Sequence, residues 1–186
     1  MNYHFKLLMT AGVLAASLGI QTVQAAKTSM TIALQLEPPH LDPTSAAAGA
    51  IDSVLYSNVF EGLTRFASDG AVIPGLAKSW EISDDGTEYT FQLNSGVTFH
   101  DGSTMDANDV KFSLDRARSE ESTNAQKALF SGINNIEVLT NDKVKVTLAS
   151  PNGSFLFNMA WGDAVIVAPE TVDGIKTNPI GTGAFK

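Results

Sequence analysis

A histidine and three carboxylates lie within ten residues at the start of the stretch FHDGSTMDANDVKFSLDRA, residues 99–117. They are His100, Asp101, Asp106 and Asp109. Imidazole and carboxylate groups are common metal ligands and common general acids and bases in enzymes. Their crowding into one loop and the start of one helix leaves two interpretations, a chemical site or the capping of a helix.

Helix initiation accounts for two of these acids. Asp106 precedes ANDVKFSLDRA, in which apolar residues recur at three- and four-residue steps, a pattern that predicts a helix. Asp is a favoured N-cap residue, and Asp109 is spaced to act as the acidic member of a capping box. Asp101 and Gly102 predict a turn after a strand that ends at Phe99. Only His100 is left without an explanation.

Metal and catalytic motifs fit the sequence poorly. The acids lack the alternate spacing of a calcium loop, and the chain after residue 25 holds two histidines and no cysteine, too few for zinc. It contains no G-x-S-x-G or H-E-x-x-H motif, and GTGAFK at residues 181–186 lacks the spacing of a phosphate-binding loop. A catalytic Ser/His/Asp triad formed by residues far apart in the sequence stays an open alternative. The sequence therefore favours a binding protein over an enzyme, with no cofactor and no metal site.

The charge balance excludes several partners. The 186 residues include 12 basic and 20 acidic side chains, a formal net charge of -8. Nucleic acids and anionic membranes need a basic face, so neither is an expected partner. The absence of cysteine leaves core burial as the means of stabilisation.

The first residues predict export. Lys6 is followed by the apolar run LLMTAGVLAASLGI and then by QTVQAA, which has small residues around a cleavage position. This pattern is typical of a secretory signal peptide, here residues 1–25, and the run is shorter than the roughly 20 apolar residues of a membrane span. We expect a soluble product in a bacterial periplasm.

Hydrophobic periodicity predicts the elements of the remaining chain. The run from Ser29 to Leu36 alternates apolar with small or polar residues, which indicates a strand with one buried face. Residues 46–66 carry apolar side chains at helical spacing, which predicts an amphipathic helix that ends near Glu61 and Gly62.

Two hairpins are predicted farther along. The dipeptide Asp85-Gly86 separates WEIS from TEYTFQL, and residues 135–148 contain two alternating runs around the turn TND. The other expected elements are a helix at 107–119, a helical stretch at 124–130, a buried helix or strand at 155–160 and a short buried strand at 165–168. Alternating strands and helices indicate an α/β or α+β class with a mixed sheet.

The stretch LAKSWEISDDGTEYTFQLNSGVTFHDGSTMDANDVKFSLDRA, Leu76 to Ala117, resembles the signature of a known family. The family is that of the extracytoplasmic solute-binding proteins of ABC importers, family 5, the dipeptide, oligopeptide and nickel type. Asn94 and Ala184 depart from its pattern, which usually has a basic residue and a proline at these places. Supporting matches are LDP at 41–43, FEGL at 60–63, PGLA at 74–77 and NPIGTGAFK at 178–186.

The resemblance implies a fold of the two-lobed periplasmic-binding-protein type, α/β with a mixed sheet, in the large peptide-binding class. Because family members are much longer than this chain, we expect only part of lobe one and its inserted subdomain to be present. The implied divisions are a signal peptide at 1–25, the start of lobe one at 26–47, the inserted subdomain at 48–176 and re-entry into lobe one at 177–186.

The resemblance also implies a function. Such proteins bind a peptide or similar small solute by closing two lobes and deliver it, as monomers, to a membrane permease. Carried over to this sequence, the cleft residues would be Glu37, Pro38 and His40, then Met159, Trp161 and Asp163, then Gly181, Thr182 and Gly183.

Simpler interpretations stay open at this stage. Glu37 and His40 can be ordinary loop residues, and Trp161 can belong to the core, because aromatic side chains contribute large buried areas. The rival functions are a secreted cell-envelope hydrolase and a small secreted interaction module.

Overall fold

The computed structural model describes residues 31–45 and 48–186, and the chain divides into two units, residues 1–34 and 35–186. The predicted signal peptide lies outside the described residues. In the first unit, residues 31–34 have no regular secondary structure. Within the described ranges, none of the helices combines the length and the apolar character that a membrane span requires.

A four-stranded antiparallel sheet is the centre of the second unit, with the strand order β3-β4-β6-β5. Both predicted hairpins are confirmed, one formed by β3 and β4 and the other by β5 and β6. At the first turn, Gly86 adopts a φ of 69°, a conformation that glycine accepts without steric cost. The strands are β3 (Ala77–Ile82), β4 (Glu88–Leu93), β5 (Ile133–Thr140) and β6 (Lys143–Leu148).

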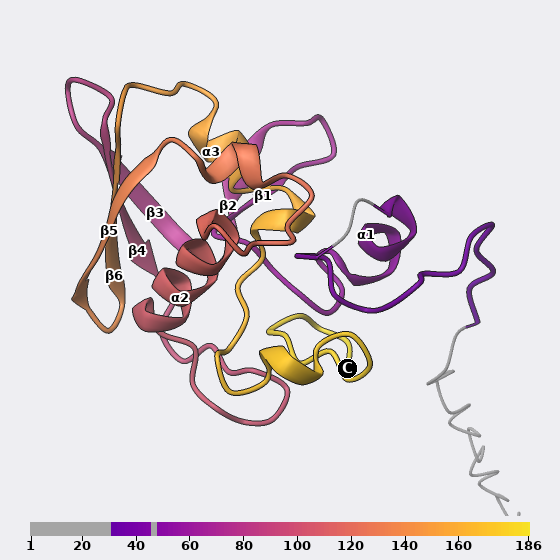
Figure 1. The fold of residues 1–186 in the computed structure, drawn as a ribbon. Helices are drawn as coiled ribbons and strands as arrows, with labels where there is room; N and C mark the ends of the chain where they lie inside the picture. Colours follow the sequence, from indigo (N-terminus) through magenta and orange to yellow (C-terminus); the bar gives the residue numbers. More distant parts are fainter. Residues whose placement is uncertain (1–30, 46–47) are drawn as a thin grey trace, which may run out of the picture. The chain divides into compact units, whose positions relative to one another are not determined.

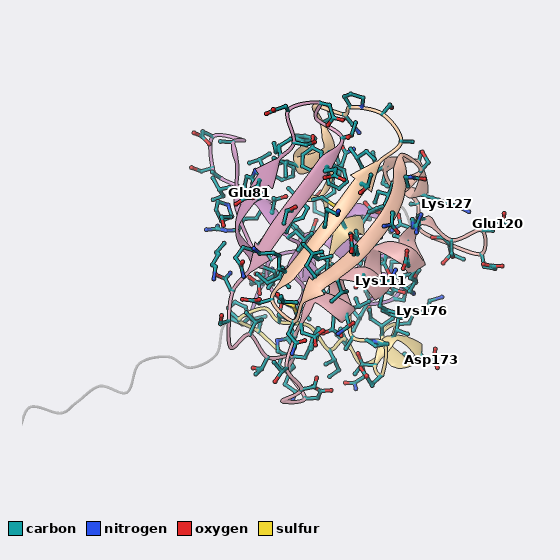
Figure 2. All side chains as sticks on the ribbon, turned by 90° about the vertical axis from the view of Figure 1, so that its left-hand side faces the viewer. Glu81, Lys111, Glu120, Lys127, Asp173 and Lys176 are labelled. Atoms are coloured by element: carbon teal, nitrogen blue, oxygen red, sulfur yellow. The ribbon has the colours of Figure 1, made fainter. Side chains whose placement is uncertain are left out.

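Alternation along the strands gives the sheet one apolar and one polar face. Figure 2 shows the polar outer face, with Glu81 of β3 at one edge. On this face the Lys145 ammonium lies 3.7 Å from the Glu88 carboxylate and 3.2 Å from that of Glu137. Ile82, at the end of β3, is exposed. The inner face buries Tyr89, Phe91 and Leu93 of β4 and Val144, Val146 and Leu148 of β6, as predicted.

Helix α2 (Ala107–Arg118) packs against this inner face (Figure 1). It buries Val110 and Leu114, and each such side chain contributes roughly 1.5–3 kcal/mol when fully buried. The predicted capping box is confirmed. The amide of Asn108 donates to Asp106 Oδ1 at 2.7 Å, and the amide of Asp106 donates to Asp109 Oδ2 at 2.8 Å. These acids therefore begin a helix.

A smaller apolar cluster surrounds α1 (Gly49–Leu55), which lies away from the sheet in Figure 1. The predicted helix, expected to end near Glu61 and Gly62, stops at Leu55. Ser57 adopts a φ of 59°, and its amide donates to the carbonyl of Phe60 at 2.8 Å, which interrupts the helical hydrogen-bond ladder. Farther along, the segment continues as β1 (Thr64–Phe66), paired with β2 (Val72–Pro74).

The predicted strand at residues 29–36 is not formed over residues 31–36. Ile32, Leu34 and Leu36 are 66%, 50% and 71% exposed. No strand within the described ranges pairs with this segment, and a lone strand leaves its amides and carbonyls without partners. The alternating pattern therefore identified the apolar residues but not their environment.

Other predicted elements are shorter than expected. The helical stretch at 124–130 is a 3-10 turn, η1 (Lys127–Phe130), and the strand expected to end at Phe99 is a single bridge between Thr98 and Thr104. Residues 165–168 are buried as predicted but form one isolated bridge, from Gly62 to Val165, and no strand. The stretch at 155–160 contains α3 (Phe155–Asn158), and the remaining elements are η2 (Gly162–Ala164) and η3 (Val172–Gly174).

Removing the helix cap should weaken the fold. We expect Asp106→Ala to lower the free energy of unfolding by about 1 kcal/mol, because two amides of the first turn lose their hydrogen-bond geometry. Urea denaturation followed by circular dichroism measures this change. Asp84→Ala, at an exposed hairpin position, is the matched control, and equal stability of the two variants would contradict the capping role.

Candidate functional site

His100 binds the loop of Gly181, Thr182 and Gly183. Its amide donates to the carbonyl of Gly181 at 2.9 Å, and its ring Nδ1 accepts from the amide of Gly181 at 3.3 Å. The ring Nε2 lies 2.8 Å from the carbonyl of Gly183, so this nitrogen carries the proton and donates. The histidine that the helix cap left unexplained therefore holds a distant loop.

The other side of this loop packs on residues 58–61. The amide of Gly183 donates to the carbonyl of Val59 at 2.9 Å. A Cβ atom on Gly181 would collide with the carbonyl of Val59, and one on Gly183 with the carbonyl of Asn58. These glycines allow close approach to this chain's own backbone. Between them, the Thr182 hydroxyl donates to Glu61 Oε2 at 2.9 Å.

Asp42, in the LDP sequence, links the turn at residues 41–44 to α2, and we call this set of contacts the Asp42 tie. Its carboxylate is buried and accepts from the amide of Thr44 at 2.9 Å and from the hydroxyl of Thr44 at 2.6 Å. The guanidinium of Arg116 lies 3.4 Å from the same carboxylate and also donates to the Thr44 hydroxyl. A buried charge is tolerated when it is paired and hydrogen-bonded, as here.

Glu37, Pro38 and His40 precede this tie. Glu37 is exposed, whereas Pro38 and His40 are half-buried. The ring Nδ1 of His40 accepts from the amide of Asp42 at 3.2 Å, so His40 helps to shape the turn.

Beside the tie is a pocket of about 220 Å³, which we call the Arg116 pocket. It offers a guanidinium, a carboxylate and several hydroxyl groups, a set that suits a small polar ligand. Sequence reasoning missed it because its residues come from separate segments and match no motif. Its lining residues are Thr44, Arg116, Ser119, Glu121, Ser122 and Thr123.

A second pocket, the Glu61 pocket, has a volume of about 250 Å³. It is lined by Ser57, Glu61, Gly62, Arg65 and Gly75. It contains one acidic and one basic side chain, and it connects with the predicted residues through the bond between Thr182 and Glu61.

The predicted cleft residues Met159, Trp161 and Asp163 lie in different environments. Met159 is fully buried in the main core, whereas Trp161 is 40% exposed. The ring of Trp161 lies edge-on to those of Phe66 and Phe157, with centroids 6.5 Å and 6.1 Å away. The interpretation of Trp161 as a core residue is therefore wrong, and the three rings form a partly exposed aromatic cluster.

Asp163 is buried near a second carboxyl group, that of Asp52. Burial raises the pKa of Asp163 to about 6, and the charge of Asp52 adds to this effect. Burial also raises the pKa of Asp52, whose carboxylate packs against Gly162 where a Cβ atom would otherwise sit. No sequence pattern indicates this pair, because 111 positions separate the two acids.

None of the nine predicted residues lines the Arg116 pocket or the Glu61 pocket. The glycine loop adjoins the Glu61 pocket through Thr182, and His40 adjoins the Arg116 pocket through Asp42. In the part of the chain that the structure describes, no group of three or more His, Asp or Glu side chains has a metal-binding arrangement.

Comparison with known proteins defines the class. Residues 71–186 match the family described as bacterial extracellular solute-binding proteins, family 5 Middle. The chain belongs to this family, as its resemblance implied. The family consists of binding proteins and not of enzymes, so the hydrolase alternative is not retained.

Individual relatives extend the comparison. The glutathione-binding protein GsiB of Pectobacterium atrosepticum is 35% identical over 190 residues, which cover 100% of this chain and 36% of the relative. The nickel-binding periplasmic protein of Escherichia coli is 35% identical over 136 residues, 69% of this chain and 26% of the relative. The chain thus spans about a third of the length of these relatives.

A solved structure shares the fold. The periplasmic binding protein AgaA of A. tumefaciens R10, in complex with agropinic acid, aligns with a TM-score of 0.74 and 32% identity. The alignment covers 81% of this chain and 31% of AgaA. The fold class is therefore confirmed as the α/β architecture found in part of such proteins. Within the described residues both sheets are antiparallel, and the one parallel pairing is the isolated bridge between Tyr56 and Phe60.

The buried acid pair predicts a dependence of stability on pH. Because the folded chain holds the Asp163 proton more tightly than the unfolded chain, this group favours folding below pH about 4, and the advantage is lost as pH rises through about 6. We expect Asp163→Asn to raise the free energy of unfolding at pH 7.5 by roughly 1–3 kcal/mol and to flatten its change between pH 4 and 7.

Urea denaturation at a series of pH values between 4 and 7.5 measures both the free energy of unfolding and its dependence on pH. Asp173→Asn, at an exposed position, is the matched control. A pH profile for Asp163→Asn that parallels that of the unaltered chain would contradict the assignment.

Proposed function

We propose that this chain is part of a periplasmic solute-binding component of an ABC importer. It binds a peptide or a similar small polar solute between two lobes and presents the closed form to a membrane permease. The observation that carries this proposal is the alignment with a binding protein in complex with its solute, at 32% identity over 81% of this chain. The acidic net charge agrees with a small-molecule partner and with no nucleic-acid partner.

The proposed location is the periplasm. One relative is described as a periplasmic protein, and the first 25 residues have the pattern of a signal peptide. The proposed division keeps residues 26–47 and 177–186 in lobe one and residues 48–176 in the inserted subdomain. The amide of Leu41 donates to the carbonyl of Lys176 at 2.9 Å, and this contact between the start of lobe one and the end of the subdomain supports the division.

The proposed solute surface includes the Arg116 pocket and those of the nine predicted residues that are exposed or half-buried, whereas Met159, Asp163 and Gly181 are buried behind it. The exposed part of the Trp161 ring suits an apolar group of the solute. Arg116 presents planar donors that match a carboxylate, and the neighbouring hydroxyls can donate or accept. Glutathione, agropinic acid and nickel, the ligands named for the relatives, define the solute classes to compare with peptides.

A ligand panel tests this proposal on the longest natural product of the gene. We expect saturable heat in calorimetry with one class among dipeptides, glutathione, opines and nickel with histidine. We also expect Thr123→Trp, which fills the Arg116 pocket, to weaken that binding at least tenfold with the melting temperature unchanged. Thr98→Trp is the control, because Thr98 is exposed and does not line the pocket. Absence of binding across the panel, or equal binding by both variants, would overturn the proposal.

The contribution of a second lobe is tested with residues 26–186 alone. We expect this segment to bind the same solute at least a hundredfold more weakly than the longer product, because binding energy comes from burial between two surfaces. Calorimetry on both proteins measures the ratio. Micromolar peptide binding by residues 26–186 would show that one lobe suffices.

A further inference from the structure

We propose that the Glu61 pocket is a separate binding site for a small zwitterion, of which a free α-amino acid is the simplest example. The ligand's ammonium group meets Glu61 and its carboxylate meets Arg65. The pocket shares no lining residue with the Arg116 pocket, and the proposed solute surface adjoins it only through the bond from Thr182 to Glu61, so the inference concerns a second site.

The first argument is the separation of opposite charges. Glu61 and Arg65 line the same cavity, yet they form no ion pair with each other within the described chain. In a continuous helix, residues four apart would be neighbours. Here β1 begins at Thr64 and carries Arg65 away along a strand. The two charges therefore face a shared space, and a ligand that bears both charges can pair with each of them.

The second argument is that both side chains are held in place. Arg65 Nε donates to the carbonyl of Pro74 at 3.1 Å, which leaves its terminal N–H groups for a carboxylate. Glu61 Oε2 accepts from the Thr182 hydroxyl, which leaves Oε1 for an ammonium group. Thr182 belongs to the loop that His100 holds. Preorganised charges lose less entropy when they bind a ligand.

The third argument is the wall of the pocket. A Cβ atom on Gly62 would lie 2.7 Å from the carbonyl of Met159, and one on Gly75 would lie 2.6 Å from the carbonyl of Gly62. Packing therefore requires glycine at both places. Ser57, also in the wall, has a φ of 59°, the one positive value at a non-glycine residue in the described ranges. Such strain is commonly found at ligand sites.

The size of the pocket limits the ligand. Its volume of about 250 Å³ is below the range of roughly 300–1,000 Å³ that is usual for drug-sized ligands. A single basic side chain cannot balance a polyanion such as a nucleotide. A compact molecule with one positive and one negative group fits both limits.

The test is a ¹⁵N nuclear magnetic resonance titration of the chain with L-alanine, N-acetyl-L-alanine and L-alanine amide. We expect L-alanine to shift the amide resonances of Ser57, Gly62 and Gly75 with millimolar affinity. Blocking either charge of the ligand should weaken binding at least tenfold. Equal shifts with all three compounds, or no shift at these amides, would overturn the proposal.

Variants separate this site from the solute surface. Glu61→Gln and Arg65→Gln should each weaken L-alanine binding at least tenfold and leave the melting temperature unchanged. Glu81→Gln and Lys78→Gln, at exposed positions of β3, are the matched controls. Thr123→Trp should not alter L-alanine binding, and loss of binding in this variant would place the amino acid in the Arg116 pocket and refute the proposal.

Discussion

The close backbone approach of the loop at residues 181–183 to residues 58–61 is the constraint on which the sites depend. It requires glycine at two positions, and it places the Thr182 hydroxyl on Glu61. His100 completes the arrangement from the opposite side with two ring contacts and one backbone bond. Segments that are about 40 and 80 residues apart in the sequence are thereby joined by hydrogen bonds, and the Glu61 pocket lies beside them.

Two buried acids show how charge is distributed in this fold. Asp42 is compensated by Thr44 and Arg116, so its burial joins the LDP turn to α2. Asp163 has no such cation within the described residues. Burial raises its pKa, and the charge of the nearby Asp52 adds to this effect. The first arrangement stabilises the fold, and the second makes it sensitive to pH, because deprotonation of Asp163 places a negative charge in a poorly hydrated place near Asp52.

Sequence patterns predicted correctly those elements that depend on interactions between neighbouring residues. The capping box at Asp106 and the hairpin turn at Gly86 depend on neighbouring residues, and both were predicted correctly. The helix expected from residue 46 to about residue 62 is formed only over Gly49–Leu55, and the strand expected over 29–36 is not formed over residues 31–36, where no other strand pairs with it. None of the nine residues predicted for the cleft lines either pocket, although Thr182 and His40 adjoin them.

The sequence by itself determined the family, the two hairpins and the helix that α2 forms, since motif spacing and hydrophobic period are written in consecutive residues. Only the tertiary structure decided what His100 does, where the charged pockets lie and which acids share burial. The reason is that these features arise from contacts between segments separated by tens of residues. Such contacts leave no pattern in neighbouring residues. Bringing distant segments together costs chain entropy, and the packing of the whole unit decides which of these contacts form.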